Sequence, residues 1–211
     1  MHDVETSLAR SVFYEVASLG FSYPSDEVLD YVSEQLAGLS LTVKAAGFDP
    51  DTAKKCATFL SLGTTLDRDE IKRGYTELFI GGQQCRLDES EYSEHIFYRQ
   101  QRMADAAGFY RAFGFEVATD GHQRADFIGT ELEFMHVLLL KQAYAIEKSW
   151  EDKAEACLDA EGEFFHEHLE WWIPTLCEKM REVSSCAYYM SLSEYLESLA
   201  RSETSVYPLP V

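Results

Sequence analysis

The sequence lacks paired cysteines. Its five cysteines are odd in number and widely scattered, and no two of them form a CxxC pair: Cys56, Cys85, Cys157, Cys177 and Cys186. A disulfide framework usually uses an even number of cysteines, and a structural zinc site usually needs closely spaced pairs. We therefore expect free thiols, which suit the reducing interior of a cell.

Long apolar runs are missing as well. No stretch of about 18 apolar residues is present that could span a bilayer. Residues 1–21 are acidic where a secretory signal peptide would be basic. We expect a cytoplasmic protein that is neither exported nor stably inserted in a membrane.

Basic residues are scarce. The chain has 18 Lys and Arg against 37 Asp and Glu, which gives a formal net charge of −19. This charge disfavours nucleic acid and anionic lipid as partners and favours basic ones. An acidic surface also keeps a protein soluble, so the charge alone does not select a function.

Proline is absent between Pro50 and Pro174, and the Gly-rich phosphate loop, GxSxG and HExxH motifs are absent throughout. Because nearly every segment has helical periodicity, we predict an all-α fold, a single domain of about eight to ten helices. The predicted helices span residues 4–20, 26–38, 51–65, 68–80, 93–113, 125–149, 152–183 with a break near Pro174, and 187–202. A break at 116–123 leaves room for two lobes, 1–118 and 119–211.

The segment 125–145, ADFIGTELEFMHVLLLKQAYA, places charged groups inside an apolar run. At 100° per residue, its apolar side chains fall in one arc that also contains Glu131 and Gln142. Glu133 falls on the opposite side and His136 at the edge of the arc. We therefore expect Glu131 to be a buried carboxylate, which is costly unless it is paired or hydrogen-bonded.

Two Glu-x-x-His pairs, Glu133 with His136 and Glu163 with His166, raise the alternative of a di-iron carboxylate enzyme. In such bundles the ligands project inward, whereas Glu133 and Glu163 are predicted to point away from the apolar arcs of their helices. Only 30 residues separate the two motifs, which leaves little room for the usual intervening helix. We favour a protein without a metal or other cofactor.

Three stretches resemble a known family. They are YTELFIGG followed by DESEY in residues 75–92, ADFIGTELEFM in 125–135, and HLEWWIP in 168–174. In order and spacing they are similar to the TorD/DmsD-like cytoplasmic chaperones that assist maturation of molybdenum enzymes of the dimethyl sulfoxide reductase type. The resemblance covers about residues 70–180. Phe127 stands where the family often has His, so no role of that histidine is carried over.

The resemblance implies an all-helical protein without a catalytic reaction. Its partners would be the catalytic subunit of a molybdoenzyme and the twin-arginine leader of that subunit, and the chain would be a monomer or homodimer. Such a leader has a basic region and an apolar region, which an acidic protein with an apolar groove complements. A third possibility is an acidic helical adaptor for another basic partner.

The matching positions supply candidate residues for contact with the leader or client. Each also has a structural alternative: core packing for the aromatic residues, helix capping for Asp126 and for the Glu-Ser-x-Tyr segment, and a buried tie between helices for Glu131. For His168 the alternative is a satisfied interior histidine. The candidates are Tyr75, Phe79, Glu89, Ser90, Tyr92, Asp126, Glu131, His168 and Trp172.

Overall fold

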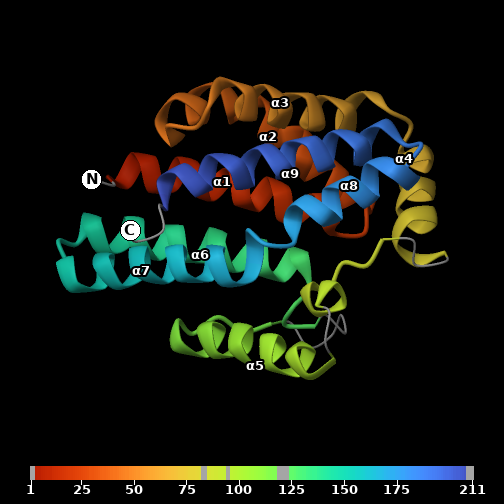
Figure 1. The fold of residues 1–211 in the computed structure, drawn as a ribbon. Helices are drawn as coiled ribbons and strands as arrows, with labels where there is room; N and C mark the ends of the chain where they lie inside the picture. The colour runs from red at the N-terminus through yellow and green to blue at the C-terminus, as the bar shows by residue number, and fades with distance from the viewer. Residues whose placement is uncertain (1–2, 82–84, 94–95, 118–123, 208–211) are drawn as a thin grey trace. The chain divides into compact units, whose positions relative to one another are not determined.

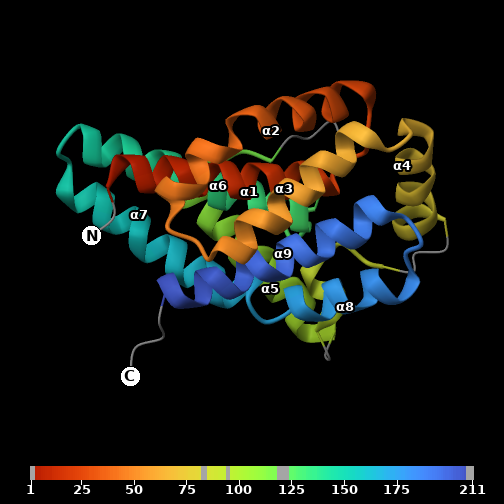
Figure 2. The same cartoon turned by 90° about the horizontal axis from the view of Figure 1, so that it is seen from above.

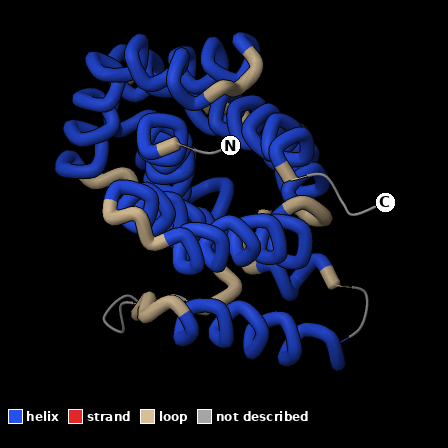
Figure 3. The backbone as a smooth tube through the Cα atoms, turned by 90° about the vertical axis from the view of Figure 1, so that its left-hand side faces the viewer, coloured by secondary structure: helices blue, strands red, loops and turns tan. Residues whose placement is uncertain are grey.

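The computed structural model describes residues 3–81, 85–93, 96–117 and 124–207. Within these ranges the chain is helical, with an isolated β-bridge and no strand (Figure 3). The predicted all-α fold is confirmed. None of the described helices is both long and apolar enough to cross a bilayer.

The chain forms two compact units that interleave along the sequence. Unit 1 comprises Met1–Ser18 and Leu87–Trp172, and unit 2 comprises Leu19–Arg86 and Ile173–Val211. The two lobes for which the sequence left room, 1–118 and 119–211, are by contrast each one continuous stretch of the chain. The two divisions differ in where the N-terminal residues belong. Residues up to Ser18 group with unit 1 because Ser7 and Ser11 bond to Gln142 and His136, more than a hundred residues later in the chain.

Unit 1 contains most of the first helix and the middle of the chain (Figure 1). Its helices are α1 (Val4–Phe21), the 3-10 turn η2 (Glu89–Tyr92), α5 (Ile96–Ala112), α6 (Ile128–Glu147), α7 (Glu151–Phe164) and the π-helical turn η3 (Phe165–Leu169). Helices α6 and α7 pack side by side along their length, and α5 is a separate helix beside this pair.

Unit 2 contains the helices α2 (Asp26–Ala46), α3 (Pro50–Thr65), α4 (Arg68–Tyr75), the π-helical turn η1 (Thr76–Ile80), α8 (Ile173–Val183) and α9 (Ala187–Val206). Helix α9 packs on both α3 and α8, and α3 also packs on α2 (Figure 2). Gly74 permits a close approach of α4 to α9, since a Cβ there would lie 2.8 Å from that of Cys186.

Local signals set several helix ends. The side chains of Ser25 and Asp67 accept hydrogen bonds from the backbone of the first turns of α2 and α4. Helix α2 continues beyond the predicted end and stops at Gly47, whose φ of 70° is left-handed. Pro174 lies in the first turn of α8, where a missing N–H is tolerated.

The phase predicted for the segment at 125–145 is confirmed on α6. Glu131 and Gln142 are buried, Glu133 is exposed and His136 is half-buried. Gln142 accepts a hydrogen bond of 2.5 Å from the Ser7 hydroxyl of α1, and His136 Nδ1 lies 2.9 Å from the carbonyl oxygen of Ser11. The polar groups on α6 thus attach α1 to unit 1.

The core of unit 1 is built around Phe134. This side chain is fully buried, and its ring centroid lies 4.8 Å from those of Tyr110 on α5 and Phe164 on α7. Close, tilted ring pairs of this kind add to the free energy gained from burying their area. Phe134 therefore joins three helices of the unit.

We predict that Phe134→Ala lowers the free energy of unfolding by about 3–5 kcal/mol, because it leaves a cavity that three helices cannot close together. Tyr144→Ala on the same helix is the control, since Tyr144 is 53% exposed; we expect it to cost less than about 1 kcal/mol. Urea unfolding measures both. Equal losses would mean that Phe134 does not centre the core.

Candidate functional site

The loop before α5 is fastened to the start of α6. Asp88 and Phe127 form an antiparallel β-bridge. The Glu89 N–H donates to the Asp126 carbonyl at 2.7 Å, and the Ile128 N–H donates to the Leu87 carbonyl at 2.8 Å. These bonds place the Glu-Ser-x-Tyr segment beside the residues of the second matching stretch.

Asp126 is fully buried, and its carboxylate holds this junction together. Oδ2 accepts from the Ser90 N–H at 3.1 Å, and Arg124 donates to both oxygens at 2.9 and 3.0 Å. Arg124 also donates to the Ser90 hydroxyl at 2.8 Å. The expectation that Asp126 caps α6 is wrong: the N-cap position is Phe127 without a side-chain cap bond, and the Asp126 oxygens are bound to Ser90 and Arg124 instead.

Glu89 has no exposed surface and is the centre of a second set of bonds. Its Oε1 accepts from Arg102 at 2.7 Å and from the Trp171 indole N–H at 2.8 Å. Its Oε2 lies 3.0 Å from His168 Nδ1, which carries the proton because an ionised carboxylate only accepts. One carboxylate thus joins the 3-10 turn, α5 and the segment after α7.

Arg102 reinforces the same connection. It also donates to the Glu167 carbonyl at 2.7 Å, and its guanidinium lies 4.2 Å from the centre of the Trp171 ring. A planar guanidinium suits both contacts, since it can stack on an aromatic ring while its N–H groups donate in the plane. The side chain is 32% exposed, so the charge that balances Glu89 lies at the edge of the unit.

The two remaining aromatic candidates of unit 1 pack against each other. The ring centroids of Tyr92 and Trp172 are 5.0 Å apart. Trp172 is fully buried and its indole N–H donates to the His168 carbonyl at 2.6 Å, whereas Tyr92 is half-buried. His168, Trp171 and Trp172 therefore connect the first five residues of the HLEWWIP segment to the rest of unit 1.

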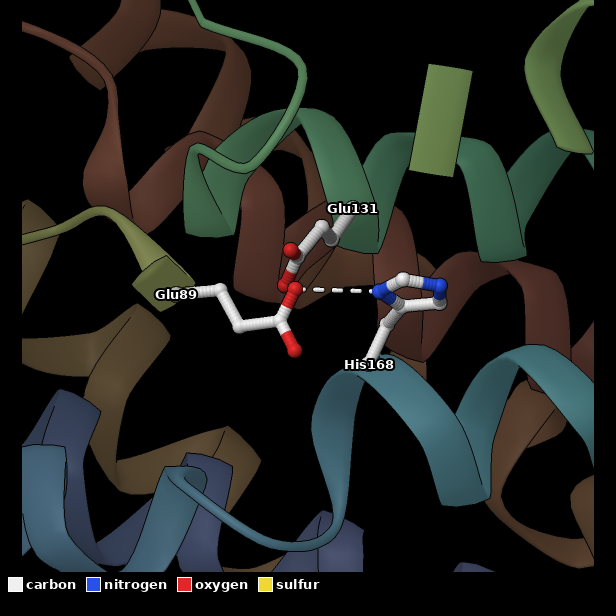
Figure 4. Close-up of side chains that lie close together, drawn as sticks. All are labelled: Glu89, Glu131 and His168. Carbon is white, nitrogen blue, oxygen red and sulfur yellow. Dashed lines mark hydrogen bonds and ion pairs between the residues drawn. The ribbon is translucent and has the colours of Figure 1, made fainter. Parts of the chain in front are cut away.

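Glu131 projects from α6 toward Glu89 (Figure 4). Neither of its oxygens meets a hydrogen-bond donor with suitable geometry, and its side chain is fully buried. Burial raises the pKa of Glu131 well above its ordinary value of 4.5, and the negative charges of Glu89 and Asp126 raise it further, while the nearby Trp172 indole acts in the opposite direction. A proton on Glu131 would remove the repulsion and provide a donor for Glu89.

Glu89, Glu131 and His168 are the described residues that could together hold a metal ion. One possible ligand atom from each lies within 4.8 Å of the others. The Glu89 carboxylate, however, already accepts from Arg102 and Trp171, and the nearby guanidinium would repel a cation. The donor set fits an internal network of a carboxylate, a neutral acid and a histidine better than a metal centre.

Tyr75 and Phe79 belong to unit 2 and are half-buried. Their ring centroids are 5.2 Å apart, and both rings also contact Tyr189 of α9, at 6.3 Å and 5.5 Å. Tyr23, which is 53% exposed, packs edge-on against Tyr75 at 5.5 Å. These two candidates therefore form part of an aromatic cluster with a solvent-facing edge.

The Glu-x-x-His pairs do not form a metal site within the described part of the chain. Glu133 and Glu163 are exposed, and His166 Nδ1 lies 2.7 Å from a Glu170 oxygen on its own helical face. His136 contacts the α1 backbone. The groups of the di-iron alternative are thus turned to solvent or to other partners.

Sequence reasoning missed Arg102, Arg124 and Trp171. A buried carboxylate needs a hydrogen-bond donor or a cation, so the predicted burial of Glu131 implies such a partner nearby. The cations of this region, Arg102 and Arg124, are bound to Glu89 and Asp126 instead. Arg102 lies 13 residues from Glu89, and helical phase within one element does not show which distant arginine a buried acid meets. Arg124 lies only two residues before Asp126, so its position in the sequence could have indicated that it pairs with this carboxylate.

We predict that Glu131→Gln changes the pH dependence of stability. A raised folded-state pKa means that the native state holds a proton that the unfolded state releases above pH 4.5. The stabilising contribution is present below that pH and is lost as the pH rises toward the folded pKa, by up to about 1.4 kcal/mol per unit. Glutamine keeps the shape and a donor without this loss.

Chemical unfolding of both proteins between pH 5 and 9 measures the effect. We expect the wild type to fall relative to Glu131→Gln as the pH rises, since the other titrating groups are common to both. A difference that stays constant over this range would show that Glu131 is ionised in the native state.

Comparison with known proteins identifies the family of this chain. The profile of the family described as nitrate reductase delta subunit matches residues 45–178, which is more than half of the chain. The chain is also similar to the perchlorate reductase assembly chaperone protein of Dechloromonas aromatica (strain RCB), with 24% identity over 204 residues that cover 92% of this chain and 88% of the relative. The matched region contains the Glu89 and Asp126 networks, and it confirms the resemblance to TorD-like chaperones found in the sequence. The chain belongs to the nitrate reductase delta subunit family of TorD-like assembly chaperones.

Proposed function

We propose that the protein is a dedicated cytoplasmic chaperone, without catalytic activity, for a reductase of the dimethyl sulfoxide reductase type. It binds the twin-arginine leader and the immature catalytic subunit, and holds back export until the molybdenum cofactor has been inserted. The observation that carries this proposal is family membership, supported by a relative of similar length whose name describes an assembly chaperone.

The internal network has a structural role within unit 1. The polar side chains of Glu89, Ser90 and Asp126 contact groups of the chain itself, so these buried residues stabilise unit 1. Glu131, His168 and Trp172 are buried with them. Direct contact with a client through these six would require the network to open, whereas Tyr75, Phe79 and Tyr92 keep some exposed surface.

A twin-arginine leader, which is basic at one end and apolar beyond it, is complementary to an acidic protein with exposed apolar area. A net charge of −19 attracts the arginines of the leader at long range, while burial of its apolar region supplies most of the affinity. The acidic adaptor remains the alternative, and it differs in one respect: a general adaptor depends on the charge of the partner and not on a continuous apolar run.

We predict micromolar or tighter binding, about −8 kcal/mol, of a synthetic peptide that contains a twin-arginine motif followed by its apolar run. Isothermal titration calorimetry with leaders of molybdoenzymes from the same host measures it. Raising the salt concentration to about 0.5 M should weaken binding modestly by screening. A negative heat-capacity change should accompany apolar burial.

The control is a peptide of the same composition in scrambled order, which keeps the charge and breaks the apolar run. Placing an aspartate within the run of the native-order peptide should weaken binding more than salt does, because it buries an unpaired charge. Equal affinity for the native and scrambled peptides would contradict leader recognition and favour the acidic adaptor.

A further inference from the structure

A groove runs between α5 and α7, within unit 1. It has a volume of about 620 Å³, larger than the other cavities described in this unit. Helix α5 contributes one wall and α7, with the turn that follows it, contributes the other. On the α7 side, Ala156 and Ala160 contribute small side chains to the wall.

The floor of the groove is formed by small and aromatic side chains. On α5 the spacing of Ala104, Gly108 and Ala112 places small residues on one helical face, and Phe109 and Phe113 lie beside them. Small side chains on the facing walls leave space for a polypeptide segment to lie against the helices. The aromatic rings offer that segment apolar area to bury.

Gly108 gives an independent indication of a partner. A Cβ added at this position would meet no heavy atom within 4 Å, and Gly108 is not among the residues with positive φ. Glycine weakens a helix interior relative to alanine, and neither packing nor backbone conformation within the chain requires it here. The missing side chain leaves room on the groove wall for an approaching backbone.

Four carboxylates border this apolar floor: Asp105, Asp159, Glu163 and Glu167. All four are exposed, and no lysine or arginine lines the groove. Their carboxylates form none of the ion pairs or hydrogen bonds found among the described residues. A cavity elsewhere in unit 1, lined by Leu140, Tyr144 and Trp150 among others, includes Lys141 and Lys153 and no acid. Asp105 and Glu167 also line a neighbouring cavity together with Arg102, whereas Asp159 and Glu163 line this groove alone among the cavities described in unit 1.

We propose that the α5–α7 groove binds a client segment in which basic side chains adjoin a short apolar stretch, with the carboxylates facing the basic groups and the floor covering the apolar ones. Charge complementarity selects this occupant, since an acidic or neutral segment would leave four like charges unbalanced at the rim. The assignment rests on the proposed function and adds the place at which the leader binds.

The test uses the full chain and a fluorescent synthetic peptide with a twin-arginine motif and its apolar run. In Gly108→Leu the new side chain enters the groove, and we expect affinity to fall by at least about tenfold. The thermal midpoint should not fall, because leucine favours helix and its Cβ meets open space. A loss of binding at an undiminished midpoint cannot be attributed to unfolding.

Two double variants of α7 distinguish the effect of the charges at the groove from the effect of the net charge of the protein. Asp159→Asn with Glu163→Gln removes two charges from the rim, whereas Glu151→Gln with Glu155→Gln removes two exposed charges of the same helix outside the groove. At low salt we expect about fivefold weaker binding for the first and less than about twofold for the second. The difference should shrink as salt is raised.

The outcomes distinguish the two proposals. Binding by the wild type with equal affinity for Gly108→Leu and for both double variants would overturn the groove assignment and leave leader recognition intact. Equal weakening by the two double variants, with no effect of Gly108→Leu, would also overturn it in favour of general attraction. A wild type that does not bind the peptide at all would overturn the proposed function and this site with it.

Discussion

A buried carboxylate, that of Glu89, holds the candidate site together. Its two oxygens bind a guanidinium from α5, an indole N–H and a histidine from the segment after α7, and its own backbone N–H bonds to Asp126 before α6. An ionised group without exposed surface is unfavourable unless such partners compensate it. The bonds to Glu89 therefore have to form together. Because one of them comes from Arg102 on α5, they also fix the position of α5 in unit 1.

The state of the second buried acid, Glu131, depends on its neighbour Glu89. Burial raises the pKa of Glu131, and the negative charge of Glu89 beside it raises this pKa further, which favours a proton on Glu131. The Glu-Ser-x-Tyr segment, the start of α6 and residues His168–Trp172 thus meet within unit 1 as scaffolding. Surfaces open to a client lie elsewhere, on the aromatic edge formed by Tyr75 and Phe79 and along the α5–α7 groove.

Helical phase explains which features the sequence could predict. Periodicity within α6 placed Glu131 inward and Glu133 outward because both depend on 100° steps along one element. The partners of Glu89 depend on how α5 and the segment after α7 approach the loop, and no local pattern contains that geometry. Asp126 was wrongly expected to cap α6 because a capping residue and a buried tie use the same residue type. The groove is likewise a property of two helices, and the spacing of small residues on α5 predicts only one wall.

Hydrogen exchange with and without a twin-arginine leader peptide tests the central claim most directly, namely that the buried network is scaffold and the α5–α7 groove is the binding surface. The amides of Glu89, Ser90, Ile128 and Glu131 should be protected already in the free protein, because these residues are buried and their N–H groups are hydrogen-bonded, and should change little. Additional protection should appear on α5 and α7 when the peptide binds. Protection that appears at 87–93 and 126–131, with none on α5 and α7, would contradict the account.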